Sequence, residues 1–407
     1  MKKIRVDLFT IVALVLLPSF LSAQQWKFIV YGDTRTNDVA HRSVLTSIKN
    51  NTPDFKFMVN VGDVVATGSN AGEWAIWRRA ITDVFGSTLQ DGTPPKYMAV
   101  DGNHDAAWWG LGQENWRANL SGQYQRFGPN TFFYFDYNDA RFILMETEND
   151  IGGQQMTMLL DAIKNNPKKW LFTIWHQPIF DFGPKAYIGE LHSYWGIPLY
   201  KSGCDIMFMG HSHYYLKTKK LALNGAMNPP LDSEKGTVQC VTGNGGAPPY
   251  AVNSNEDNNA YMIDGRYTVG YGYTEIAING DTATLRHILP DGTVFDTQTY
   301  KPNPKPAITA IQHAPEKGVP TECVLHDAYP NPFNPSTTIS FAVPQSGMYS
   351  LKVYNALGGE VATLLDHKLP AGLHKVDFNP GNLPSGTYMY RLTGKNVTIS
   401  NKMVYLK

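Results

Sequence analysis

Five short segments of the chain carry residue types that bind divalent cations, and an apolar run precedes each of them. The segments are Gly32-Asp33-Thr34-Arg35, Gly62-Asp63, Gly102-Asn103-His104-Asp105, His176 and Gly210-His211-Ser212-His213. The runs cover residues 27–31, 55–61, 96–100, 170–175 and 204–209. Short apolar runs that end in Gly-Asp, Gly-Asn or Gly-His indicate buried strands that stop at a turn. Because open α/β sheets bind ligands at the carboxyl ends of their strands, we expect all five segments to meet at one edge.

These residue types suit the hydrolysis of phosphate esters, which negative charge shields from attack. Two cations about 3.5–4 Å apart hold the oxygens and acidify a bridging water, whose hydroxide attacks phosphorus. Such a pair needs one bridging carboxylate with His, Asp and Asn ligands on either side. We expect Asp63 as the bridge, Asp33 and His213 on the first metal, and Asn103, His176 and His211 on the second. The expected ions are divalent or trivalent, with Fe, Mn or Zn favoured.

Three further residues are candidates for catalytic work beside the ligands. His104 directly follows Asn103, so its side chain projects elsewhere, and it suits protonation of the leaving alkoxide. Asp105 is expected to orient a neighbouring group. Arg35 cannot bind a metal because it stays protonated, but its planar fork can contact the substrate phosphate.

Simpler explanations exist for each residue taken alone. Asp33 and Asp63 suit turns after strands, and an isolated His176 is more often a core histidine than a ligand. His192 is expected at the surface, although it can also line the mouth of the site. Only the joint occurrence of the five segments favours the metal centre. Several aromatic residues near them are expected either to line the substrate site or to pack: Trp108, Trp109, Tyr214, Tyr215 and Tyr250.

The elements that must position these residues follow from hydrophobic periodicity. Helical spacing predicts helices over residues 37–50, 71–85 and 154–165. Residues 132–148 predict a hairpin that turns at Asn138-Asp139. Further strands are expected within 236–246 and 273–289. Together these patterns predict a mixed sheet core with flanking helices.

Length and composition indicate an exported chain of several domains. The 407 residues are 43% hydrophobic and 17% charged, which favours a sizeable core. Lys+Arg and Asp+Glu each number 35, which argues against nucleic acid as the main partner. A basic start, a short apolar stretch and a small-residue cleavage site predict a signal peptide over 1–23. No segment of the mature chain is long enough for a transmembrane helix, and three cysteines support no disulfide framework.

The remaining length divides into three parts. Residues 24–298 carry all five segments and form the expected catalytic domain. Residues 299–325 are rich in Pro and Lys and lack periodicity, which is typical of a semi-extended linker. Residues 326–407 contain short, partly alternating runs separated by Pro, Gly and Asn, which predict a small β-sandwich.

The five segments resemble the calcineurin-like metallophosphoesterase family, whose pattern is Asp-x-His, Gly-Asp, Gly-Asn-His-Asp/Glu, His and Gly-His-x-His. The resemblance covers about residues 26–298 and is greatest to the branch that is similar to purple acid phosphatases. It implies a four-layer αββα sandwich. Two positions depart from the pattern: Arg35 replaces the usual His, and Ala66 stands where that branch has a Tyr ligand. The first metal therefore lacks an expected protein ligand.

Residues 326–407 resemble the C-terminal sorting domains of type IX secretion cargo, most specifically in YPNPFNPST and in the closing NKMVYLK. This resemblance implies the type IX machinery as a partner, passage through the periplasm, and a secreted or cell-surface protein with an Ig-like C-terminal sandwich. A binding module appended to an enzyme is the alternative from strand pattern alone.

The expected function is that of an exported dinuclear phosphatase, acid-phosphatase-like, that hydrolyses phosphomonoesters. One alternative is a phosphodiesterase or nucleotide pyrophosphatase that uses the same site. Another is an inactive surface protein that kept the fold as a binding scaffold, which Arg35 and Ala66 favour.

Overall fold

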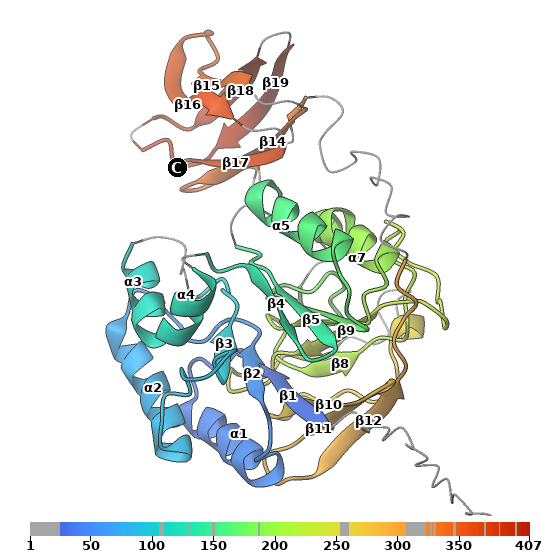
Figure 1. Cartoon of the computed structure of the whole chain (residues 1–407). Helices are drawn as coiled ribbons and strands as arrows, with labels where there is room; N and C mark the ends of the chain where they lie inside the picture. Colours follow the sequence, from blue (N-terminus) through green and yellow to red (C-terminus); the bar gives the residue numbers. More distant parts are fainter. Residues whose placement is uncertain are drawn as a thin grey trace, which may run out of the picture.

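The computed structural model describes residues 25–407 apart from 106–109, 129, 149–150, 186–187, 253–259, 307–322, 326–327, 329–330, 345–346, 370–371, 382 and 395–396. The expected signal peptide (1–23) and most of the expected linker (299–325) lie outside the described residues. Figure 1 shows a larger α/β body followed by a smaller body of strands.

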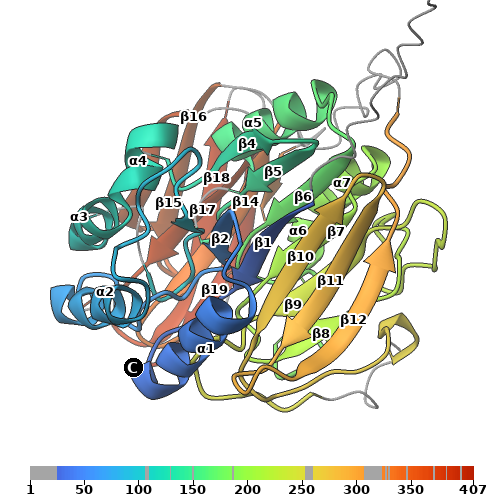
Figure 2. The same ribbon diagram turned by 60° about the horizontal axis from the view of Figure 1, so that its bottom comes forward.

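Two six-stranded sheets form the centre of the α/β body (Figures 1 and 2). The first sheet has the order β12 (Val294–Tyr300), β11 (Thr282–Ile288), β10 (Tyr273–Asn279), β1 (Trp26–Tyr31), β2 (Phe57–Asn60), β3 (Tyr97–Ala99). The second has the order β4 (Phe133–Tyr137), β5 (Ala140–Leu144), β6 (Trp170–Ile174), β7 (Ile206–Met209), β9 (Val238–Thr242), β8 (Tyr215–Lys217). β1, β2 and β3 are parallel, as are β5, β6, β7 and β9. Their carboxyl ends therefore lie along one edge of each sheet.

Helices cover the outer face of each sheet. Against the first sheet lie α1 (Asp38–Asn51), α2 (Ala71–Phe85) and α3 (Gly110–Asn119). Helix α4 (Ser121–Phe127) lies beside β3, and its Phe127 packs against the core between the sheets. Against the second lie α5 (Gly153–Lys164), α6 (Gly189–Leu191), the π-helical turn η1 (His192–Gly196) and α7 (Ile197–Lys201). A short 3-10 turn, η2, covers Ala260–Met262. The layers run helix, sheet, sheet, helix, as the family resemblance implied.

Strand β1 shows why the sequence runs are continuously apolar. Side chains alternate across a strand, so Phe28 and Val30 enter the core between the sheets, while Ile29 and Tyr31 pack against the helices. All four are fully buried. The core between the sheets is largely aromatic, and the rings of Phe28 and Phe172 lie 5.2 Å apart across it.

Most predicted elements have the expected positions, and the exceptions have local causes. The helix over 71–85 and the hairpin turn at Asn138, with a left-handed φ of 49°, are confirmed. Strand β12 was not predicted, and it runs two residues past the expected domain end at 298. The prediction that His192 lies at the surface is wrong, because η1 turns it into the core beneath Phe180.

The C-terminal strands form a separate sandwich around their own core. One sheet has the order β13 (Val324–Leu325), β14 (Thr337–Val343), β17 (Gly372–Phe378). The other has the order β16 (Glu360–Leu369), β15 (Gly347–Tyr354), β18 (Gly386–Gly394), β19 (Val397–Tyr405). Strand β16 was missed from the sequence because its residues are mostly exposed and lack a regular alternation. Within the described residues, none of the helices has the length and apolar character needed to cross a bilayer.

Candidate metal centre

The five predicted segments meet where the strand ends of the two sheets come together. Asp33 follows β1, Asp63 follows β2, Asn103 follows β3, His176 follows β6, and His211 and His213 follow β7. Backbone hydrogen bonds tie the loops: the Asp33 amide donates to the Gly62 carbonyl (2.9 Å), and the Gly210 amide donates to the His176 carbonyl (2.8 Å). The first bond joins loops of the first sheet, and the second joins loops of the other.

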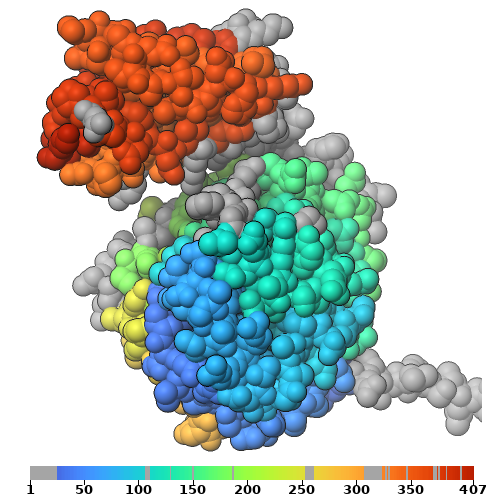
Figure 3. Space-filling view, turned by 90° about the vertical axis from the view of Figure 1, so that its left-hand side faces the viewer, coloured from blue at the N-terminus to red at the C-terminus, as the bar shows by residue number. Residues whose placement is uncertain are grey.

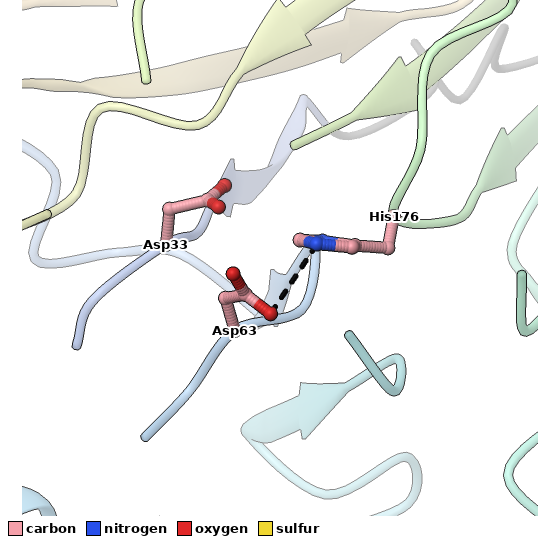
Figure 4. A group of neighbouring side chains, drawn as sticks. All are labelled: Asp33, Asp63 and His176. Carbon is pink, nitrogen blue, oxygen red and sulfur yellow. Dashed lines mark ion pairs between the residues drawn. The ribbon is translucent and has the colours of Figure 1, made fainter. Parts of the chain in front are cut away.

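A buried group of metal-type ligands lies at the centre of this edge. One ligand atom from each of Asp33, Asp63 and His176 falls within 4.8 Å of the others. Figure 4 shows both carboxylates beside the His176 ring, with an ion pair between Asp63 and His176. Each of the three side chains is at most 1% exposed. Buried carboxylates need a compensating cation nearby, because burial penalises their charge.

The residues predicted for the second metal converge closely on one another. His176 Nε2 lies 3.3 Å from Asp63 Oδ1, 3.1 Å from Asn103 Oδ1 and 3.3 Å from His211 Nδ1. His211 Nδ1 also lies 2.9 Å from Asn103 Oδ1. Oxygen and imidazole nitrogen atoms in this arrangement suit Zn, Mn or Fe. All four residues therefore fit a single metal site.

The residues predicted for the first metal, Asp33 and His213, lie beside the guanidinium of Arg35. Asp33 Oδ1 lies 3.5 Å from His213 Nε2. The guanidinium of Arg35 lies beside them: its Nε donates to Asp63 Oδ2 at 3.1 Å, and its Nη2 is 3.5 Å from His213 Nε2. Arg35 was expected to reach a substrate, but in this structure it also contacts two of the predicted ligands.

Backbone carbonyls orient three of the histidine rings. A carbonyl oxygen can only accept a hydrogen bond, so the ring nitrogen facing it must carry the proton. The pairs are His176 Nδ1 with Val61 (2.8 Å), His213 Nδ1 with Pro248 (2.6 Å) and His104 Nδ1 with Ala66 (2.9 Å). Each ring therefore turns its Nε2 toward the centre, which is the atom that a ligand or an acid would use.

Neighbouring charges shift the pKa values of His176 and His211 in opposite directions. Burial opposes a charge on His176, but the carboxylates of Asp63 and Asp33 outweigh it and raise its pKa to about 9. Burial and the positive charge on His176 lower the pKa of His211 to about 2.

Three site residues adopt a left-handed backbone, which non-glycine residues rarely do. The φ angles are 53° for Asp33, 53° for Asp63 and 65° for His211. The His211 amide donates to both carboxylate oxygens of Asp33, at 3.1 and 2.9 Å. Strand β7 ends at Met209, and the turn after it brings the rings of both His211 and His213 to the centre. Such strain is typical of functional sites.

Asp105 joins two loops of the centre. Its carboxylate accepts from the Val65 amide at 3.1 Å and from the Gly102 amide at 3.0 Å. Burial, with the nearby charge of Asp63, raises its pKa to about 8. Asp105 therefore positions the Gly62-Asp63 and Asn103-His104 loops.

The sequence analysis did not identify Asn60 as a residue of the site, and it named Tyr250 only among several aromatic residues. Asn60 shapes the Asp63 turn, because its Oδ1 accepts from the Gly62 amide (2.9 Å) and its Nδ2 donates to the Tyr97 hydroxyl (3.0 Å). One polar residue inside an apolar run was the available signal.

Tyr250 stacks on the His213 ring with centroids 4.0 Å apart. Tyr214 and Tyr215 are packed in the core, whereas Trp108 and Trp109 lie outside the described residues.

Comparison with family models identifies two regions of the chain. Residues 27–215 match the calcineurin-like phosphoesterase family. Residues 327–406 match the secretion system C-terminal sorting domain. No curated protein gives a match to the chain.

Solved structures with this arrangement include a plant enzyme and a parasite protein. The purple acid phosphatase PPD1 from yellow lupin (Lupinus luteus) seeds aligns with a TM-score of 0.54 and 17% identity, over 69% of this chain and 54% of that one. GAP50, the anchor in the inner membrane complex of Plasmodium, aligns with a TM-score of 0.51 and 15% identity, over 69% of this chain and 90% of that one. The aligned part spans about half of the lupin protein, and at these identities the similarity shows the fold alone.

Proposed function

Because the chain carries a calcineurin-like phosphoesterase domain and a secretion system C-terminal sorting domain, we propose that it is an exported, metal-dependent phosphatase that hydrolyses phosphomonoesters. The observation that carries the proposal is the convergence of Asp63, Asn103 and His211 on His176 Nε2, all within 3.3 Å. A carboxylate, an amide and two imidazoles that converge on one point offer the oxygen and nitrogen ligands that a divalent cation takes.

The chain's own residues then divide the work. Asp63, Asn103, His176 and His211 would hold a metal, which when bound supplies Lewis acidity toward a phosphoryl oxygen and lowers the pKa of water. His104 would protonate the leaving alkoxide through Nε2, which lies 4.0 Å from Asp63 Oδ2 and belongs to a side chain that is 34% exposed. Arg35 would bind a phosphoryl oxygen through its guanidinium.

Charge near the centre favours a monoester over a diester. Lys185 lies close enough to His211 that its charge helps to lower the pKa of that ring, and its Nζ lies 5.6 Å above the Tyr250 ring. Arg35 adds a second cation on the side of His213. A monoester carries up to two negative charges and a diester one, so two protein cations stabilise the monoester more strongly.

The test is a substrate panel with the purified protein. We expect chelation to abolish phosphate release from an aryl phosphomonoester, and added Mn²⁺ or Zn²⁺ to restore it, with a lower kcat/KM for the bis-aryl diester. A higher kcat/KM for the diester would reverse the substrate assignment. Absence of hydrolysis after metal loading would favour the scaffold alternative, for which Arg35 beside Asp63 is the supporting observation.

A further inference from the structure

The guanidinium of Arg35 lies among the atoms that a first metal would need. Its Nε donates to Asp63 Oδ2 at 3.1 Å and its Nη2 faces His213 Nε2 at 3.5 Å. The Arg35 side chain is only 14% exposed, and that of Asp63 is 1% exposed. The contact with Asp63 is therefore largely shielded from water, where an ion pair is stronger than at the surface.

The polar groups on this side of the centre have hydrogen-bond partners within the protein. Both oxygens of Asp33 accept from the His211 amide. His213 donates from Nδ1 to the Pro248 carbonyl, so Nε2 is left as an acceptor for Arg35. That nitrogen and Asp33 Oδ1 are both acceptors and lie only 3.5 Å apart, so a nearby positive charge stabilises them.

On the opposite side of the centre, no arginine or lysine of the described residues hydrogen-bonds to the predicted ligands Asn103, His176 and His211. There Asp63 Oδ1, Asn103 Oδ1 and His211 Nδ1 surround His176 Nε2, and among the described residues no arginine or lysine forms an ion pair with Asp63 except Arg35. A metal can enter this side through oxygen and nitrogen atoms that already face one point. On the Arg35 side it would have to displace a guanidinium that cannot lose its charge.

We propose that Arg35 replaces the first metal ion, so that the centre holds a single metal on Asp63, Asn103, His176 and His211 while the guanidinium supplies the second positive charge. This inference rests on the proposed metal-dependent function and changes the expected stoichiometry from two metals to one. A guanidinium can neutralise and hydrogen-bond a phosphoryl oxygen, but it cannot bind water as a ligand. In the described part of the chain, no residue accepts a hydrogen bond from Arg35 Nη1, which leaves that group for the substrate.

The test is a count of bound metal. The purified protein is loaded with Mn²⁺, desalted and analysed by inductively coupled plasma mass spectrometry, together with Arg35→His, which restores the Asp-x-His pattern, and Asn103→Ala. We expect one metal per chain in the wild type, a twofold rise in Arg35→His and loss of binding in Asn103→Ala. Arg42→His is the matched control, because Arg42 pairs with Asp38 and Asp83 on α1 and α2, and it should retain one metal.

Electron paramagnetic resonance provides a second readout. We expect the spectrum of an isolated Mn²⁺ in the wild type and of a coupled pair in Arg35→His. Two metals per wild-type chain, or a coupled wild-type spectrum, would overturn the inference, and this count decides even if Arg35→His does not fold.

The count also separates this inference from the proposed function. One metal without hydrolysis of any phosphate ester would leave the role of Arg35 standing and refute the phosphatase. Two metals with hydrolysis would do the reverse.

Discussion

At the scale of single residues, His104 has the geometry of an acid held in place by the backbone. The Ala66 carbonyl fixes its Nδ1 at 2.9 Å, so its Nε2 faces the centre. Ala66 stands where the similar branch has a tyrosine ligand, and here the main chain of that residue contributes instead of its side chain. The orientation of the His104 ring depends on a backbone carbonyl, which every residue type has, so it could not be predicted from the sequence.

Replacing His104 tests this role. We expect His104→Ala to lower kcat for alkyl phosphates about 100-fold or more, because general acid catalysis contributes on this order. Activated aryl phosphates should lose much less, since their leaving groups need no proton. The measurement is kcat across a series of leaving-group pKa values, and equal losses along the series would contradict the assignment.

A second substitution concerns the ligands. His211→Ala removes the Nδ1 atom that lies 2.9 Å from Asn103 Oδ1, so we expect kcat/KM to fall about 100-fold or more, which is about 2.7 kcal/mol of transition-state stabilisation. The urea midpoint should change little, because His211 is only partly buried. Wild-type turnover in this variant would refute the metal site.

At the scale of elements, two glycines bring the loops close enough to fix Asp33. A Cβ atom on Gly210 would lie 2.4 Å from Asp33 Oδ2, and one on Gly243 would lie 2.5 Å from the same oxygen. Both glycines follow strands of the second sheet, whereas Asp33 follows a strand of the first. The loops after β7 and β9 can therefore approach the Asp33 carboxylate only because glycine, which has no side chain, occupies positions 210 and 243.

We accordingly expect Gly243→Ala to displace the Asp33 carboxylate. The substitution should lower stability by about 1–3 kcal/mol through overpacking and reduce kcat/KM more than tenfold. Gly386→Ala is the matched control, since a Cβ atom at that position would meet nothing within 4 Å. Urea unfolding and steady-state kinetics measure both effects, and equal activity in the two variants would argue against this packing constraint.

Two buried histidines outside the centre make stability depend on pH. Burial lowers the pKa of His41 on α1 to about 3, and likewise that of His287 on β11 to about 3. His287 stacks on Tyr215 at 3.8 Å and lies 3.1 Å from Asn244 Nδ2, so its neutral form fits the site.

The sign follows from proton binding. Unfolded histidines bind protons below pH about 6.5 while the folded ones stay neutral, so stability is greatest above that pH and falls as the pH drops toward 3. Between pH 7 and 5 each residue should cost about 2 kcal/mol in the free energy of unfolding. In urea titrations at pH 7 and pH 5, His287→Gln should reduce the loss of unfolding free energy by the share of one histidine. The same loss as in the wild type would contradict the role of His287.

At the scale of the whole molecule, the chain combines two separately packed bodies. Figure 3 shows the C-terminal strands as a lobe distinct from the α/β body, and its core residues form a cluster of their own. The match to a sorting domain assigns this lobe to secretion. Hydrolysis and export should therefore separate experimentally.

We expect removal of residues 326–407 to leave kcat/KM of the purified protein within about twofold, because every predicted ligand lies in the first body. The truncated protein should accumulate in the periplasm, while the full chain reaches the medium or cell surface. Fractionation with immunoblotting measures this. Unchanged export together with lost surface binding would instead indicate an adhesion module.

How much of this could be predicted depends on how local each feature is. The apolar runs, the helix over 71–85 and the hairpin at Asn138 are set by neighbouring residues, and they lie where expected. The placement of Asp63 and His176 at strand ends also followed from the sequence, whereas their meeting across two sheets is set by how the sheets pack. His192 and β16 were not predictable, since burial of the one and pairing of the other depend on distant elements.

The sequence alone determined which ligand types are present and which strand ends carry them. Only the tertiary structure placed the guanidinium of Arg35 against Asp63, 28 residues away, and against His213, 178 residues away. The physical reason is that a side chain's partner is decided by which loops the two sheets bring together. Whether a position serves as a ligand, a substitute for a metal or a contact to the substrate is therefore a property of the fold.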